Sequence, residues 1–183
     1  MKGSHKEPLS TDFQAIPSTL GPLDPERRKN LDVCIQFLER WHRFDVDGFA
    51  DLMTPEGILE TPYRHDGMQK IGPEAIKEEY YKVMRVFGNH DCLWLEMHAT
   101  ENPALFVYKS KSWNQVLLGP SKGNVYSNDY VVFMEVEGYK ISRFSEYFNG
   151  DITRASFDGD MRNWDIAIEE AAAEVAAESA ETT

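Results

Sequence analysis

The most informative stretch of this chain is 125-VYSNDYVVFMEVEGYKISRFSEYF-148. Its two segments are rich in aromatic and β-branched residues and are joined by a short turn at Glu137-Gly138, which predicts a β-hairpin. A sheet with one face on a core should alternate apolar and polar residues. Several polar side chains interrupt this pattern, and inward-facing ones would line a cavity. The sequence therefore predicts a pocket here, with the candidates Tyr126, Asn128, Asp129, Arg143 and Glu146.

Helical patterns precede this hairpin and strand patterns surround it. Asp24-Pro25 predicts a helix start, because Asp caps a helix and Pro suits its first turn. Apolar residues at helical spacing extend that helix to about Phe44. The further expected elements are a short helix at 49–53, strands at 57–63 and 68–71, a helix at 73–87, and strands at about 90–99, 104–116, 124–136 and 139–148. Helices followed by a long antiparallel sheet indicate the α+β class.

The 183 residues fit one domain with an appendage at each end. We expect an extended, Pro-containing arm at 1–24, a single barrel-like α+β domain at 25–157, and an acidic, Ala-rich tail at 158–183 that is helical from Trp164 to about Ser179. The tail carries eight acids and one base of a chain with net charge −12, so the body is only mildly acidic. The tail either docks on the body or on a partner subunit, or is a frayed acidic solubiliser.

Composition disfavours several classes of protein. There is no basic stripe, so we expect no nucleic acid partner. No apolar run approaches the ~20 residues of a membrane span, and the N-terminus lacks the apolar segment of a signal peptide. We therefore expect no membrane partner and a cytoplasmic protein. Cys34 and Cys92 have no metal-ligand spacing and are expected to be reduced, buried thiols. We predict neither a metal site nor an organic cofactor.

Two stretches carry a family resemblance. They are 57-GILETPYRHDGMQKIGPEAIKEEY-80 and 137-EGYKISRFSEYFNG-150. With the first helix, they resemble the fold of nuclear transport factor 2, ketosteroid isomerase, scytalone dehydratase and the SnoaL-like polyketide cyclases, over about 26–150. The resemblance implies a cone-shaped, curved mixed β-sheet wrapped around three N-terminal helices, a cystatin-like roll with a pocket between sheet and helices. An open sheet face of this kind usually pairs with a copy of itself, so we expect a homodimer.

Within this superfamily the chain resembles the phenazine-biosynthesis A/B type. The residues that suggest it are 25-PERRKNLDVCIQFL-38 and 128-NDYVVFMEVEGYKISRFSEYF-148. In that type an acid in the last strand and a Tyr in the strand before it line the pocket, which implies such roles for Glu146 and Tyr126. The pocket histidine of that type has no counterpart here, and Glu79 stands in its place.

The resemblance implies cofactor-independent proton transfer. Burial raises the pKa of a carboxyl toward neutrality, so that it can take and give a proton, and a nearby Tyr hydroxyl stabilises an enolate or alkoxide. Glu146 is the leading candidate; its alternative role is a rim glutamate paired with Arg143. Tyr126 is its expected helper. Asn128 shares the strand face of Tyr126, whereas Asp129 lies on the other face unless a bulge intervenes.

Glu60 is a further catalytic candidate. Ketosteroid isomerase places its base just before a Pro, but here Thr61 precedes Pro62, and one residue flips a strand side chain to the other face. We assign Tyr80, Trp113, Arg64 and His65 to substrate binding. The alternative for Tyr80 and Trp113 is packing in the core. The alternative for Arg64 and His65 is a solvated loop.

His98 is the last substrate-binding candidate. It shares one face of its strand with His90, Cys92, Trp94 and Glu96, opposite Leu93, Leu95 and Met97. We expect the Leu/Met face to pack on the core, which leaves the Trp94 face exposed or in a dimer interface. In the alternative arrangement, Glu96 and His98 are pocket groups.

These residues predict a cofactor-independent acid/base lyase or isomerase. Dehydration, aldol or retro-aldol cleavage, and cyclisation all fit this set of side chains. The expected substrate is a small aromatic or polyketide-like oxygenated molecule. The alternative is a non-catalytic small-molecule-binding or assembly protein of the same fold.

Overall fold

The computed structural model describes residues 23–181; the predicted arm at 1–24 lies almost entirely outside them. The helices are α1 (Pro25–His42), α2 (Val46–Ala50), α3 (Pro73–Val86), α4 (Gly150–Ser156) and α5 (Arg162–Glu181). The strands are β1 (Met53–Thr61), β2 (Met68–Ile71), β3 (Phe87–Ala99), β4 (Leu105–Val116), β5 (Val125–Glu137) and β6 (Lys140–Phe148). Helix α4 was not predicted, and α2 begins earlier than predicted because the Asp45 side chain caps it by accepting from the Gly48 N–H.

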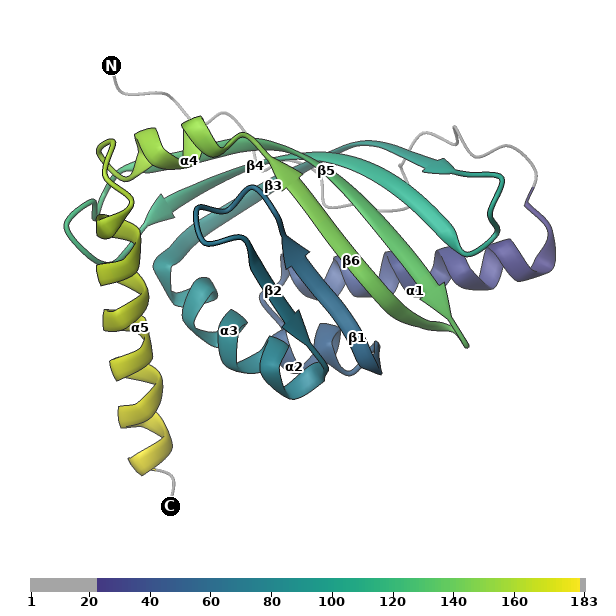
Figure 1. Ribbon diagram of the computed structural model, residues 1–183, viewed down its shortest axis with the longest axis horizontal. Helices are drawn as coiled ribbons and strands as arrows, with labels where there is room; N and C mark the ends of the chain where they lie inside the picture. The colour runs from purple at the N-terminus through teal and green to yellow at the C-terminus, as the bar shows by residue number, and fades with distance from the viewer. Residues whose placement is uncertain (1–22, 182–183) are drawn as a thin grey trace.

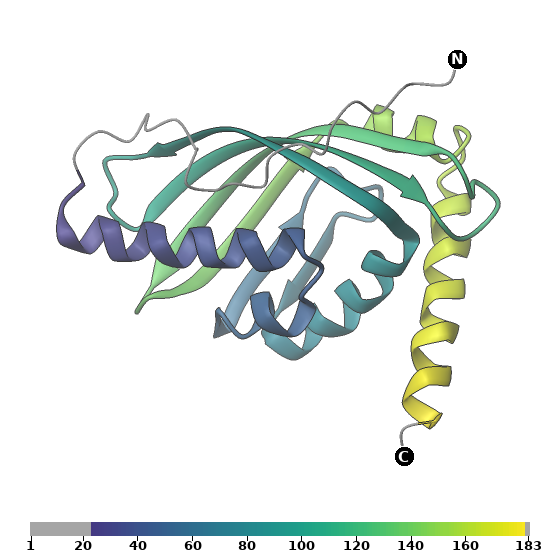
Figure 2. The same cartoon turned by 180° about the vertical axis from the view of Figure 1, so that it is seen from behind.

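The six strands form one curved sheet in the order β2-β1-β6-β5-β4-β3. Strands β1 and β6 run parallel, and every other neighbouring pair is antiparallel. The sheet curls over α1, α2 and α3 (Figures 1 and 2). This confirms the predicted α+β class and the cone of mixed sheet around three N-terminal helices.

The β5–β6 turn and a register shift beside it together fix which side chains face inward. Gly138 and Tyr139 both have positive φ, 55° and 60°, as a type I′ turn requires and as the right-handed twist of the flanking strands favours. The turn pairs Val136 with Ile141, and beyond a register shift between Glu135 and Val136 the strands pair Val132 with Glu146 and Met134 with Phe144. Val132, Met134 and Phe144 are all buried, so Glu146 shares the concave face with the core.

An aromatic cluster joins the helices to this concave face. Phe37 and Trp41 of α1 pack on Phe144, with ring centroids 5.0 and 4.9 Å apart respectively. Tyr80 of α3 packs on Trp41 at 4.6 Å. Fully burying one such side chain contributes about 1.5–3 kcal/mol. This cluster therefore holds α1 and α3 under the sheet.

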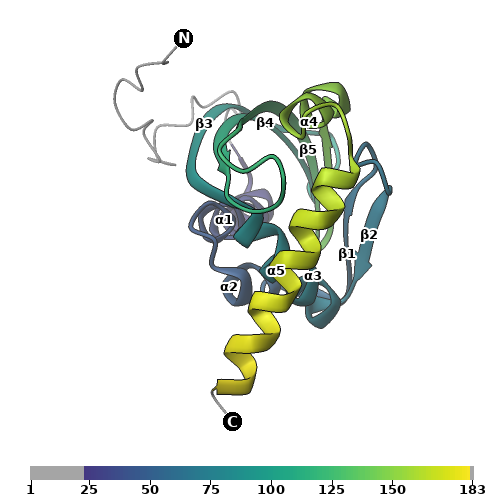
Figure 3. The ribbon, with the colours of Figure 1, turned by 90° about the vertical axis from the view of Figure 1, so that its left-hand side faces the viewer.

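A second, smaller core forms where α5 meets the sheet. It contains Val86, Val116, Tyr126, Phe157, Trp164, Ala167 and Ala171. Seen along the roll, α5 crosses its end beside α3 (Figure 3). Of the alternatives for the tail, the structure shows docking on the body.

Candidate functional site

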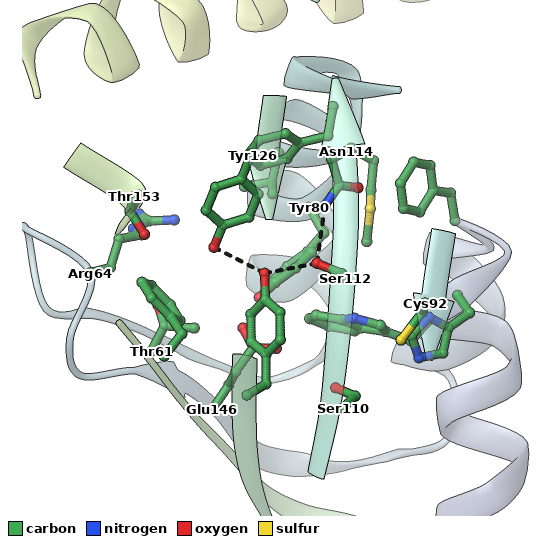
Figure 4. A pocket seen from close by; sticks show the side chains of 18 of the residues that line it. Thr61, Arg64, Tyr80, Cys92, Ser110, Ser112, Asn114, Tyr126, Glu146 and Thr153 are labelled. Atoms are coloured by element: carbon green, nitrogen blue, oxygen red, sulfur yellow. Dashed lines mark hydrogen bonds between the residues drawn. The ribbon is translucent and has the colours of Figure 1, made fainter. Parts of the chain in front are cut away.

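A cavity of about 100 Å³ lies where the two cores meet. Trp41 and Tyr80 line it from the first core, and Tyr126 and Trp164 from the second. Its polar lining comes mainly from the concave faces of the central strands. Figure 4 shows Ser110, Ser112 and Asn114 of β4, Tyr126 of β5 and Glu146 of β6. Tyr130 of β5 also lines it. The site is therefore a mostly aromatic chamber with convergent polar groups, the usual character of a small-molecule pocket.

Glu146 supplies the carboxyl of this chamber. The residue is 9% exposed, and its carboxyl has no hydrogen bond or ion pair with any side chain that the structure describes. Arg143, proposed as its alternative partner, binds Glu60 instead. Burial raises the pKa of the Glu146 carboxyl to about 8, because the charged form loses its hydration. At neutral pH it is mostly protonated yet close to its titration point, which suits a group that both gives and takes protons.

A chain of hydroxyls runs beside Glu146. Asn114 Nδ2 donates to Ser112 Oγ (3.1 Å), Ser112 Oγ to the Tyr130 hydroxyl (3.1 Å), and the Tyr130 hydroxyl to that of Tyr126 (2.9 Å; Figure 4). Burial, reinforced by the nearby charge of Glu146, raises the pKa of both tyrosines. The two phenols therefore stay protonated and serve as hydrogen-bond donors.

Arg64 brings a positive charge to the cavity wall, but two carboxylates balance it. Its Nε and Nη2 donate to Asp66 (both 2.6 Å), and Nη1 donates to Glu79 (2.8 Å). Burial by itself would lower the pKa of the Arg64 guanidinium, but these two carboxylates raise it. Burial likewise opposes ionisation of Glu79, but the charge of Arg64 lowers its pKa below the usual range. The cluster is a closed ion-pair network, in which Glu79 stays ionised.

The structure brings four predicted site residues to the cavity: Glu146, Tyr126, Tyr80 and Arg64. Asn128 faces inward but lies behind the wall. Its Nδ2 donates to the Asn149 carbonyl (3.0 Å) and the Tyr126 hydroxyl (3.3 Å), and its Oδ1 accepts from the Asn149 N–H (3.1 Å). Asn128 thus ties β5 to the start of α4 and does not line the cavity.

Replacing Asn128 by Ala should therefore destabilise the fold by about 2 kcal/mol, since it leaves buried partners unsatisfied. Urea unfolding measures the change. Ser127→Ala on the same strand is the control and should change stability by less than about 0.5 kcal/mol. Equal stability of the Asn128→Ala variant and the wild type would contradict this structural role.

Two predicted catalytic acids lie on the outer face of the sheet, away from the cavity. Asp129 is exposed and pairs with Lys111 (3.6 Å); no bulge turns it inward. Burial alone would raise the pKa of Glu60, but hydrogen bonds from Ser145, Gln69 and Arg143 lower it. The pairing of Glu60 with Ser145 shows why: both point outward, while their neighbours Thr61 and Glu146 line the cavity. The displacement by one residue before Pro62 therefore decides the position of Glu60.

Three predicted substrate-binding residues also lie outside the cavity. Trp113 is on the outer face, under the Lys111 ammonium. His65 pairs with Asp165 of α5 at 2.9 Å. His98 is 44% exposed and bonds Glu96 at 2.8 Å.

A register shift in β3 between Trp94 and Glu96 explains the position of His98. Before the shift Cys92 faces the cavity, and after it Met97 faces the core. The inward side of the strand therefore changes from the predicted Trp94 face to the predicted Leu/Met face at the shift. The side chains of His90 and Trp94 lie outside the described part of the structure.

Sequence reasoning missed several lining residues. In β4, the run Tyr108-Lys109-Ser110-Lys111-Ser112 alternates small or aromatic residues with lysines, and this period-2 signal marks the polar inner face. His42, at the end of α1, and Thr61 also line the cavity. The buried Thr61 hydroxyl has no hydrogen-bond partner among the described residues, so it is available to a ligand. Trp164 comes from the tail, and only its apolar spacing hinted at burial.

Among the side chains that the structure describes, no three His, Cys, Asp or Glu are placed to hold a metal ion. No helix of the described part of the chain has the length and apolarity to cross a membrane. Cys34 and Cys92 are both free and buried, as predicted.

A SnoaL-like domain profile matches residues 35–144, from the middle of α1 to the middle of β6, which hold most of the cavity-lining residues. Glu146 follows two residues after the matched range. The chain belongs to the SnoaL-like family. A search of curated proteins finds no match. Solved structures confirm the fold, and they include a phenazine biosynthesis-related protein of Pseudomonas aeruginosa, as the resemblance predicted. It is 18% identical with a TM-score of 0.62, over 73% of this chain and 87% of that one.

Two other structural neighbours have descriptions that concern cyclisation. A proposed polyketide cyclase of Xanthomonas campestris is 14% identical, with a TM-score of 0.60, over 72% of this chain and 98% of its own. The epoxide hydrolase/cyclase-like enzyme SalBIII, of pyran ring formation in the polyether salinomycin, is 12% identical with a TM-score of 0.57, over 67% and 92%. At such identities these SnoaL-like and related proteins share the fold with this chain, and the reaction must be argued from its own site.

Proposed function

We propose that this SnoaL-like protein is an acid/base lyase or isomerase that acts without a cofactor on a small, uncharged, aromatic or polyketide-like oxygenated substrate. The observation that carries the proposal is the Glu146 carboxyl, which faces an aromatic cavity, has no polar partner among the described residues and has a pKa raised to about 8. Such a carboxyl is costly to keep in a protein interior and is therefore a candidate functional group.

The proposed step is abstraction of a proton next to a carbonyl group. The Glu146 carboxylate takes the proton from carbon, and the electron pair of the C–H bond moves toward the carbonyl oxygen. Tyr126 receives hydrogen bonds from Tyr130 and Asn128 and also hydrogen-bonds Thr153. In the proposed step its proton turns to the developing enolate oxygen. Return of the proton to another carbon gives an isomer, and departure of a β-hydroxyl as water gives dehydration.

The charge balance of the cavity supports an uncharged substrate. Arg64 is paired with Asp66 and Glu79, and Glu146 is mostly protonated at neutral pH. The aromatic walls favour a flat, apolar molecule. The families of reaction named for the structural neighbours, cyclisation and epoxide opening, are compatible with the same proton-transfer groups.

The pH dependence of turnover tests the proposal. Wild-type protein is incubated with neutral aromatic substrates: a β-hydroxy ketone, a β,γ-unsaturated ketone and an epoxy alcohol. For at least one, kcat/KM should rise about tenfold per pH unit and level off near pH 8, because the ionised fraction of Glu146 rises in that way. Ligands that bind without turnover at any pH would contradict the catalytic proposal and favour a binding protein.

A further inference from the structure

Helix α5 forms one wall of the cavity, although it lies outside the matched SnoaL-like domain at 35–144. Trp164 in its first turn is 6% exposed and lines the cavity. Val83, Met84 and Phe87 line the cavity from α3 and the start of β3. The size of the chamber at this end therefore depends on a side chain that the shared domain does not supply.

The Trp164 indole is held in place by rings and by a cation. Phe157 packs edge-on against it at 5.3 Å, and Phe87 lies 5.7 Å away. The Arg64 guanidinium lies over its ring at 5.6 Å, a distance at which a cation attracts an aromatic face. Because Arg64 is itself fixed by Asp66 and Glu79, it positions the indole rather than offering a free charge to a ligand.

Contacts further along fix α5 against the body. The Gly119 N–H donates to Glu170 (2.8 Å), and a Cβ built on Gly119 would lie 2.9 Å from the Cβ of Ala167. Arg85 of α3 pairs with Glu174 and Glu178. The acidic residues of the tail therefore hold the helix in register at several points, which keeps Trp164 at the cavity.

We propose that Trp164 is a specificity-determining residue that limits the size of the uncharged aromatic ligand at the α5 end of the cavity. This inference deepens the proposed function, because it takes the cavity as the ligand site, but it does not require that Glu146 perform chemistry. The charge of Arg64 is balanced, and Trp164 and Phe87 wall this end with rings. The size of the Trp164 side chain should therefore decide whether a neutral fused-ring ligand fits.

Calorimetric titration with neutral ketones of increasing size tests the inference. The probes are acetophenone, 2-acetylnaphthalene and 2-acetylanthracene, and the proteins are wild type, Trp164→Leu, Trp164→Phe and Ile166→Ala. Trp164→Phe keeps a ring against Phe157 and so provides a folded variant if Trp164→Leu unfolds. Ile166 is on the same helix but exposed, which makes Ile166→Ala the matched control.

In both Trp164 variants, the ratio of the affinity for the larger ketones to the affinity for acetophenone should be about tenfold higher than in the wild type. A change of one small apolar group in a pocket alters discrimination between ligands by that order. Ile166→Ala should keep the wild-type order of affinities. An unchanged ratio in the folded Trp164 variants, the same change in Ile166→Ala, or no binding of any ketone to any of the proteins would overturn the inference. Binding of these ketones, together with no turnover of the β-hydroxy ketone, the β,γ-unsaturated ketone and the epoxy alcohol, would instead leave this inference intact and remove the proposed catalytic function.

Discussion

Replacing Glu146 by Gln should lower kcat/KM on any substrate found for this protein by about 10²–10⁴-fold, the range expected for loss of a positioned acid/base group. Gln fills the same space, so ligand binding should change by less than tenfold. The rise of activity toward pH 8 should also disappear, because its titrating group is gone. Steady-state kinetics across the pH range and calorimetric binding separate these effects.

The same variant should be more stable than the wild type in alkaline solution. Folding raises the pKa of Glu146 from 4.5 to about 8. The unfolded state therefore releases its proton at lower pH than the folded state. Stability linked to this group is fully present below pH 4.5 and is lost as pH rises through about 8. The difference between Glu146→Gln and the wild type should grow from near zero at pH 4.5 to about 3 kcal/mol at pH 7 and about 5 kcal/mol above pH 8.

Asp129→Asn is the matched control for Glu146→Gln. It removes a carboxyl from the neighbouring strand, but on the exposed outer face, so activity should stay within about twofold and stability within about 0.5 kcal/mol. Urea unfolding at several pH values gives the stabilities. A Glu146→Gln variant that keeps wild-type activity, or whose stability gain does not depend on pH, would be inconsistent with a buried proton-transfer role.

Replacing Glu79 by Ala should destabilise the protein by about 3 kcal/mol, because breaking a buried ion pair leaves a charge uncompensated. Glu79 is 5% exposed and lies within 4 Å of Arg64, Lys70 and Lys82. Asp66 continues to hold Arg64, which keeps the loss at the lower end of the range for such pairs. Urea unfolding at pH 7 measures it.

Glu78→Ala is the control for Glu79→Ala. Glu78 is the adjacent residue of α3, and its side chain is 81% exposed and pairs only loosely with Lys82 (3.6 Å). Its loss should change stability by less than about 1 kcal/mol. Equal effects of the two substitutions would mean that the Arg64 cluster adds nothing beyond ordinary surface charge.

Much of the site follows from patterns that a single sequence carries. Period-2 spacing puts Glu146 on the same face as Phe144, and both face the concave side in the structure. The turn predicted at Glu137-Gly138 is present, with Gly138 and Tyr139 as its two central residues. The side-chain directions predicted from strand periodicity were wrong where a strand contains a register shift. The shift after Trp94 in β3 moved His98 outward, and nothing in the local sequence marks such a bulge.

Two predicted catalytic carboxyls were also wrong, because their side chains face outward from the sheet. Glu60 and Asp129 have the residue type of a catalytic acid, but chemistry also needs the right face. Glu60 binds Arg143 and Ser145 across a strand pair that is distant in sequence, and Asp129 pairs with Lys111 of β4. These partners could not be assigned before the sheet order was known.

Local patterns of residues are enough to predict the class of fold, the hairpin and the candidate acid near the end of its second strand, because turn chemistry and strand periodicity act over a few residues. Tertiary structure alone decided what surrounds that acid. Burial raises the pKa of Glu146, the Arg64 charge is balanced by Glu79, and Trp164 lines the cavity from α5, outside the matched domain. Desolvation and long-range packing depend on which segments meet in space, and no local pattern encodes that meeting.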